Sequence, residues 1–246
     1  MKLLKKCEIL NNDVYILGVS KDYIIVNNNY NGVSVYDKKF NFLQSIEMSS
    51  DLLLYQVYSS MQNNYFILLD VDNGYIYVLD APRFDFEVNE FNNDRVFLNY
   101  YYVKEDVFCL KDSEYDYYFS YNGGKLLSKN KNTTGIVICN NQEQIIYKDG
   151  EKFIHAINNT KESILLNYSD DYNIVVGSNH IFAFNGSQIY IYRTNHFKKI
   201  WSVSNSYLIR SIQLSDKKIY ILLNSIVNDD ISIVEIYDIV ELNDMD

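Results

Sequence analysis

The sequence predicts an all-β chain in which residues 1–246 form a single domain, a six-bladed β-propeller. Tight-turn dipeptides, short apolar strands and polar loops all recur at a spacing of roughly 40 residues, the size of one propeller blade. The composition agrees, because 24 Tyr, 13 Phe and only one Pro favour strands over helices.

The tight turns set the period. Asn-Gly and Asp-Gly pairs supply the positive φ angles that two-residue hairpins need. Their glycines are separated by 42, 76 and 36 residues, and 76 is two periods of 38; the pairs are Asn31-Gly32, Asn73-Gly74, Asp149-Gly150 and Asn185-Gly186. The two remaining turns are expected at residues 113–116 and 228–230.

Each turn follows a short strand that is rich in apolar residues, which is typical of strands buried on both faces. These strands are expected to begin near Tyr23, Tyr65, Val107, Ile145, Ile181 and Ile219. A polar loop also occurs once per period, at residues 11–13, 49–51, 92–94, 130–132, 169–171 and 204–206.

Four strands therefore fit each period. The first period gives strands at residues 14–17, 23–26, 33–36 and 42–46. The last period supplies only three, at residues 208–214, 219–223 and 231–237, whereas residues 3–10 have the pattern of a fourth strand. We expect this N-terminal strand to be the outer strand of the last blade, which would close the ring and hide its open edges.

The third strands often end in an aromatic or apolar residue followed by Asp, as in Val35-Tyr36-Asp37, Val78-Leu79-Asp80 and Ile236-Tyr237-Asp238. These endings resemble the Trp-Asp endings of WD-repeat and quinoprotein-like propellers. The resemblance implies the superfamily shape and no particular family, because Gly-His before the first strand is absent and Trp201 lies in a fourth strand. A β-sandwich or jelly roll is the alternative fold.

The net charge of −10 indicates the partners that this surface accepts. It repels nucleic acid and anionic membranes, and it suits a basic protein or divalent cations, although solubility alone also explains it. Neither a membrane span of ~18 apolar residues nor a secretory signal is predicted. Cys7, Cys109 and Cys139 have no motif spacing, as expected of reduced cysteines in a cytoplasmic protein.

Catalytic motifs are absent from the sequence: His155, His180 and His196 lack metal-binding spacing, and no serine elbow or phosphate loop is present. Propeller sites usually lie where loops of several blades converge. The expected binding residues are Tyr30, Asp51, Asn93, Asp94, Asp170, Asp171 and Asn205. Asp13, Asp51, Asp94 and Asp171 are expected around one rim, whereas Tyr30 is a candidate because it lies in the turn of residues 27–31 with little core to join. Asp51, Asp94 and Asp171 would be the calcium ligands if calcium binds there.

The leading functional hypothesis is a non-enzymatic binding module for a protein partner, possibly basic, in a scaffold or immunity-type role. One alternative is a hydrolase or lyase with a calcium-assisted site at the channel mouth. A second is a carbohydrate-binding propeller that uses the tyrosines of the third period, residues 100–102, 115, 117, 118 and 121. No other cofactor is expected.

Overall fold

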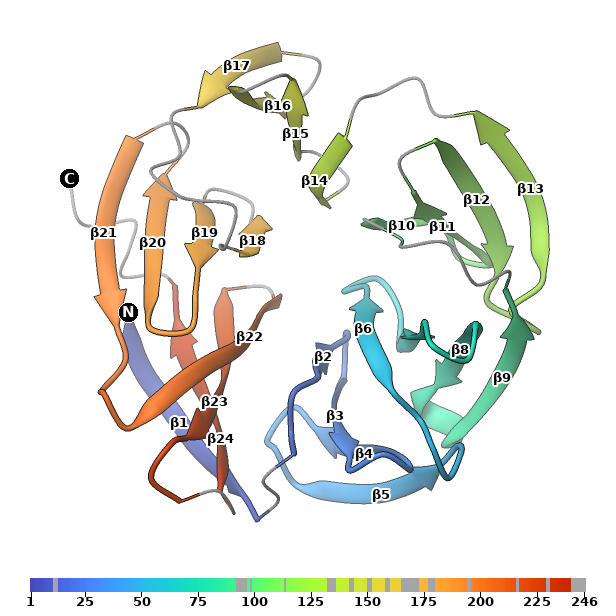
Figure 1. Cartoon of the computed structure of the whole chain (residues 1–246), viewed down its shortest axis with the longest axis horizontal. Coiled ribbons are helices and arrows are strands. Elements are labelled where there is room, and N and C mark those ends of the chain that lie inside the picture. The colour runs from blue at the N-terminus through green and yellow to red at the C-terminus, as the bar shows by residue number, and fades with distance from the viewer. Residues whose placement is uncertain are drawn as a thin grey trace. The chain divides into compact units, whose positions relative to one another are not determined.

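The computed structural model describes residues 1–10, 13–91, 97, 99–112, 114–131, 136–141, 144–149, 152–157, 160–164, 173–176, 180–193, 196–215, 217–228 and 231–239. These residues form six four-stranded antiparallel sheets, in each of which neighbouring strands are hydrogen-bonded (Figure 1). A single turn of 3₁₀ helix, Ala81–Arg83, follows β8. Among the described elements, no helix has the length and apolar character needed to cross a membrane.

The chain divides into two compact units, and the first comprises Met1–Asn93 with Val203–Asp246. It contains three sheets. In order of pairing these are β1 (Lys2–Ile9), β24 (Ser232–Asp238), β23 (Lys218–Ser225) and β22 (Tyr207–Ser215); then β2 (Leu17–Val19), β3 (Tyr23–Asn28), β4 (Gly32–Asp37) and β5 (Phe42–Glu47); then β6 (Leu54–Ser59), β7 (Tyr65–Asp70), β8 (Tyr75–Asp80) and β9 (Asp85–Glu90).

The second unit, Asp94–Ser202, contains the other three sheets. They are β10 (Asn99–Lys104), β11 (Val107–Lys111), β12 (Tyr115–Ser120) and β13 (Leu126–Lys131); β14 (Ile136–Asn141), β15 (Gln144–Asp149), β16 (Lys152–Ile157) and β17 (Thr160–Ile164); and β18 (Asn173–Val176), β19 (His180–Phe184), β20 (Gln188–Arg193) and β21 (His196–Ser202).

The sheets of the first unit pack face to face, as blades do. Within that unit β2 lies beside both β22 and β6 (Figure 1). Apolar side chains of β2, of β3 and of Ile16 just before β2 fill the space on both sides of this sheet. On the side of β23, Leu17, Ile24 and Val26 pack against Tyr220 and Leu222. On the other side, Ile16 and Ile25 pack against residues of β6 and β7, namely Leu54, Val57, Phe66 and Leu68. The continuous apolar runs of the second strands are explained by this burial on both faces.

The predicted count of six blades is corrected to five. The structure has five blades, although its described residues form six four-stranded sheets. The physical reason is that periodicity reports hairpin-linked strands and does not report how the resulting sheets pack as blades.

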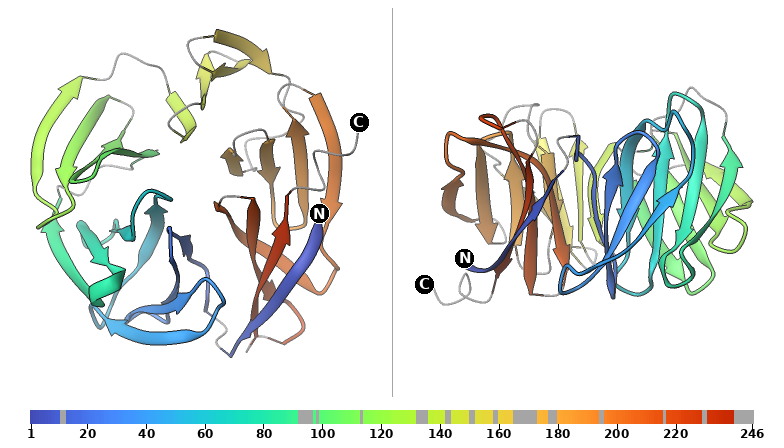
Figure 2. Two further views of the ribbon diagram at one scale, coloured as in Figure 1. Left: turned by 180° about the vertical axis from the view of Figure 1, so that it is seen from behind. Right: turned by 90° about the horizontal axis from the view of Figure 1, so that it is seen from below.

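The predicted pairing of the N-terminal strand with the last sheet is confirmed. β1 runs antiparallel to β24, from Lys2 opposite Asp238 to Ile9 opposite Ser232, as the blue and red strands in Figure 2 show. Only Cys7 and Ile9 of this strand are buried, so the strand covers the edge of β24 with an otherwise exposed surface.

The first strand of the second sheet differs from its prediction. It was expected at residues 14–17 but spans Leu17–Val19, because the backbone N–H groups of Tyr15 and Ile16 donate to the Asn27 side chain instead of to a neighbouring strand. An Asn side chain can thus replace the strand ladder over two residues.

Candidate functional site

The connections between sheets and the hairpins between second and third strands meet at one end of the first unit. Backbone hydrogen bonds join them there: Met48 N donates to Asn31 O (2.7 Å), Leu52 N to Tyr30 O (2.7 Å) and Ile226 N to Ser206 O (2.9 Å). We call this end the loop face. It comprises the described residues of 10–16, 28–32, 47–55, 70–75, 90–91, 203–208 and 225–231.

Asn27 holds the chain where it enters the loop face. The side chain is buried, and its Oδ1 accepts from Tyr15 N (2.8 Å) and Ile16 N (2.9 Å). Its Nδ2 donates to the carbonyls of Asp13 and Asn29. All four contacts run between the second strand and the loop face, so Asn27 fixes the position of residues 13–16.

Tyr30 lies on the loop face, in the hairpin between β3 and β4, and packs against a second tyrosine. The ring centroids of Tyr15 and Tyr30 are 6.5 Å apart, and 45% of Tyr30 is exposed. Burial raises the pKa of the Tyr15 phenol, so this ring stays neutral. Tyr30 therefore has a supported position and an accessible surface, the two properties of an aromatic anchor.

Asp51 also lies on the loop face, where its backbone is held in place. Asn73 Nδ2 donates to the Asp51 carbonyl (3.1 Å) and to Asp70 Oδ2 (2.9 Å), while the Asp51 side chain is exposed. Asp70 itself is buried and also accepts from Asn73 N (3.2 Å). A buried carboxylate thus orders the hairpin beside Asp51.

This role of Asp70 was not predicted from the sequence, and it recurs where other second strands end. Asp112 Oδ1 accepts from the N–H groups of Glu114 (2.7 Å) and Tyr115 (2.6 Å), and Asn185 Oδ1 accepts from Gln188 N (2.9 Å). The available signal was an Asp or Asn directly after each apolar second strand. Such side chains bond to the backbone of the following turn.

The other predicted residues divide into two groups. Asn205 is exposed on the loop face, in the turn that Tyr207 N and Ser204 O close (3.0 Å). Asn93, Asp94, Asp170 and Asp171 lie outside the described residues. The structure thus places Tyr30 next to Asp51 and puts Asn205 on a different sheet of the same face.

Two of the three predicted calcium ligands, Asp94 and Asp171, lie outside the residues that the structure describes. Within the described ranges, no three His, Cys, Asp or Glu side chains gather in a way that would hold a metal ion. Asp51, the remaining ligand of that set, is exposed and has a turn role. The calcium site stays a prediction.

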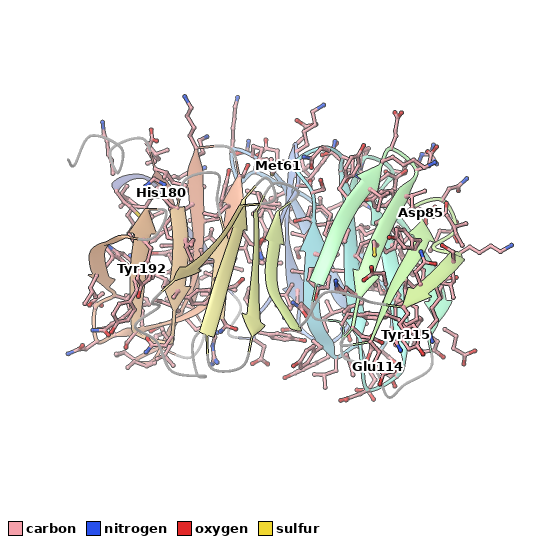
Figure 3. All side chains as sticks on the ribbon, turned by 90° about the horizontal axis from the view of Figure 1, so that it is seen from above. Met61, Asp85, Glu114, Tyr115, His180 and Tyr192 are labelled. Atoms are coloured by element: carbon pink, nitrogen blue, oxygen red, sulfur yellow. The ribbon has the colours of Figure 1, made fainter. Side chains whose placement is uncertain are left out.

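Three tyrosines of the β10–β13 sheet and its turns serve packing. Tyr100, Tyr117 and Tyr121 are buried, the hydroxyls of Tyr100 and Tyr121 are hydrogen-bonded, and the Tyr117 hydroxyl donates to Asp112 Oδ2 (2.9 Å). Tyr115, labelled in Figure 3 at the opposite end of unit 2 from His180, lies under the Lys129 ammonium group at 3.6 Å. None of these contacts favours a sugar-binding surface.

Large apolar side chains are exposed on the loop face. Tyr55 is 61% exposed and forms a β-bulge, since Leu54 pairs with Asp70 and Gln56 with Leu69. Such a bulge re-aims one side chain out of the strand pattern. The complete set is Leu10, Tyr30, Leu53, Tyr55, Leu208, Ile226 and Val227.

Comparison with solved structures shows the propeller fold. Hsv2 of Kluyveromyces lactis superimposes with a TM-score of 0.51 at 9% sequence identity, over 85% of this chain and 71% of that chain. Hsv2 of Kluyveromyces marxianus gives a TM-score of 0.50 at 10% identity, over 92% and 72%. No protein-family model and no curated protein matches the sequence. The likeness shows the fold alone, and the WD-repeat resemblance stays a prediction.

Proposed function

We propose that this protein is a non-enzymatic interaction propeller that binds a protein partner through the loop face of its first unit. The observation that carries the proposal is the set of seven large apolar side chains exposed on that face. They range from Leu208 at 36% to Leu10 at 86% exposed. Exposed aromatic and aliphatic side chains that gather on one surface are typical of protein-binding sites.

The loop face is also held rigid before any partner binds. The hydrogen bonds of Leu52 and Met48 join one hairpin to the next connection, and Asn73 joins that connection to Asp70. A rigid surface loses little conformational entropy on association, which favours affinity. Tyr30 and Tyr55 suit the role of anchors, because tyrosine is enriched among the residues that dominate binding energy.

The net charge of −10 supports a basic protein as the partner and disfavours nucleic acid and anionic membranes. A scaffold or immunity-type role would follow from the identity of that partner. The calcium-assisted hydrolase and carbohydrate-binding alternatives have no contact among the described residues in their favour.

The test is affinity capture with the tagged full chain, compared with two matched double variants. Tyr55→Ser with Val227→Ser alters the loop face, and Leu43→Ser with Val88→Ser alters equally apolar, exposed positions on outer strands β5 and β9. A captured protein is then purified, and its affinity for each variant is measured by titration.

We expect a protein that binds wild type and the outer-strand variant and that binds the loop-face variant at least about tenfold more weakly. Equal affinity for all three chains would place the binding surface elsewhere. Loss of binding in both variants, with both still folded by circular dichroism, would also contradict the assignment to the loop face.

A further inference from the structure

We infer that the loop face binds a segment of the partner in which lysine or arginine alternates with apolar side chains. This inference rests on the proposed function and specifies the chemistry of the same surface. It follows from the charge of the loop face, from the positions of the positively charged residues, and from the exposed side chains of Tyr30, Asp51, Leu53, Tyr55 and Asp72.

The loop face carries charge of one sign. The stretches whose described residues form it are 10–16, 28–32, 47–55, 70–75, 90–91, 203–208 and 225–231, and their sequences contain neither Lys nor Arg. Five of its described acidic residues are exposed: Asp13, Glu47, Asp51, Asp72 and Glu90. Their fields add over a face that lacks cations of its own.

The opposite end of the same sheets carries both signs, so the acidity of the loop face is local. Lys21, Lys217 and Lys218 are exposed there, and Arg83 lies 3.4 Å from Asp80. Met61, in a turn, and Asp85, at the start of β9, lie at this end and are labelled in Figure 3. If the acidity served solubility alone, it would have no reason to separate from the lysines.

The most acidic part of the loop face lies over the β2–β5 and β6–β9 sheets. Two cations reach the face on its other side, over the β1/β22–β24 sheet: Arg210 is exposed on β22, and Lys6 Nζ lies 5.5 Å from the ring centroid of Tyr207. The surface for a cationic segment is therefore the part formed by Tyr30, Asp51, Leu53, Tyr55 and Asp72, which we call the Tyr55 surface.

Each component of the Tyr55 surface matches a part of a lysine or arginine side chain. The open rings of Tyr30 and Tyr55 attract a cation placed over their faces. The Asp51 and Asp72 carboxylates accept charge-assisted hydrogen bonds from ammonium or guanidinium groups. Leu53, 42% exposed, offers an apolar surface to the side-chain stem and to the apolar residues between the cations.

The test uses two short synthetic peptides and the full chain, with binding followed by fluorescence anisotropy. One peptide alternates lysine with leucine, and its matched control carries glutamate in place of lysine. We expect only the lysine peptide to bind, and we expect its affinity to fall as salt is raised toward about 0.15 M, where the screening length is ~8 Å.

Variants of the chain locate the binding. Tyr55→Ser should weaken the lysine peptide about tenfold, because it removes an aromatic anchor. Asp51→Asn with Asp72→Asn should weaken it about three- to tenfold and reduce its salt dependence. The matched control, Asp22→Asn with Asp85→Asn, changes two exposed carboxylates at the opposite end and should leave the affinity unchanged.

Equal binding of the lysine peptide to all of these chains would show general attraction to an acidic protein and would overturn the inference. Binding of the glutamate peptide would overturn it as well. A captured partner that depends on Tyr55 and not on Asp51 or Asp72 would leave the proposed function standing without the charge inference. Failure to capture any partner, with the peptide results as expected, would count against the proposed function alone.

Discussion

Asn27→Ala is expected to destabilise the fold and to loosen the loop face together. The substitution removes the oxygen that accepts from the N–H groups of Tyr15 and Ile16. An N–H group left buried without an acceptor costs about 1–3 kcal/mol, so two of them cost about 2–6 kcal/mol. Because a domain is typically stable by about 5–15 kcal/mol, this loss should lower its denaturation midpoint clearly.

The assay is urea unfolding of the full chain, followed by tyrosine fluorescence and circular dichroism. Asn205→Ala is the matched control, since Asn205 is exposed on the same face and the change should cost about 0.5 kcal/mol or less. If Asn27→Ala cost less than about 1 kcal/mol with an unchanged m-value, the three contacts of this side chain with Asp13, Tyr15 and Ile16 would not be what holds residues 13–16.

Three further predictions concern the sheets. Gly32→Ala should lower the free energy of unfolding in urea by about 3 kcal/mol, because the added Cβ would lie 1.9 Å from the backbone oxygen of Ile46. Gly123 has a φ of +77° with open space around it, so Gly123→Ala should lower this free energy by only about 1 kcal/mol. A larger loss for Gly123→Ala than for Gly32→Ala would contradict this prediction. In the same assay, Ile9→Ala should lower the free energy of unfolding by about 2 kcal/mol, because Ile9 is buried. Leu4→Ala changes an exposed residue of the same strand and should lower it by about 0.5 kcal/mol or less. An equally small effect of both substitutions would show that β1 does not stabilise the fold. Burial raises the pKa of the Cys109 thiol from 9.0 to about 12, so the stabilisation that this thiol contributes is complete below pH 9 and is lost as the pH rises toward 12. Iodoacetamide with peptide mapping should therefore find this thiol unmodified at pH 8 until urea unfolds the chain. Labelling of the native protein at the rate of a free thiol would contradict it.

Most strand positions could be predicted because period-2 burial and turn residues are local signals. The second strand expected to begin at Tyr65 spans Tyr65–Asp70, and the one expected near Ile181 begins at His180. The N-terminal strand could be assigned because the last period lacked one strand and residues 3–10 had its pattern.

The remaining features depend on contacts between residues far apart in the sequence. The late start of β2 results from the Asn27 side chain, and nothing in the apolar run Val14–Leu17 reports that contact. The blade count required knowledge of which sheet faces pack, which repeat spacing does not contain. The pairing of the N-terminal strand, by contrast, could be predicted from the strand missing in the last period and from the pattern of residues 3–10.

The candidate site was predicted in position more than in composition. Asp51 was expected on a rim and lies on the loop face, because loops that join sheets in the same order end on the same side. Tyr30 was expected only in the turn of residues 27–31, and its carbonyl accepts from Leu52 N, next to Asp51. Tyr55 and Val227 were missed. Tyr55 lies in an apolar strand pattern, and only the bulge between Leu54 and Gln56 turns it outward. That irregularity has no sequence signature.

Hydrogen–deuterium exchange of the full chain, with and without a saturating binding partner, tests most directly whether the loop face is the binding surface. The account predicts slower exchange in peptides that cover residues 29–31 and 48–55 when the captured protein or the lysine–leucine peptide is bound. Slowed exchange confined to the outer strands β5 and β9, or to the turns at residues 20–22 and 80–85, would contradict it.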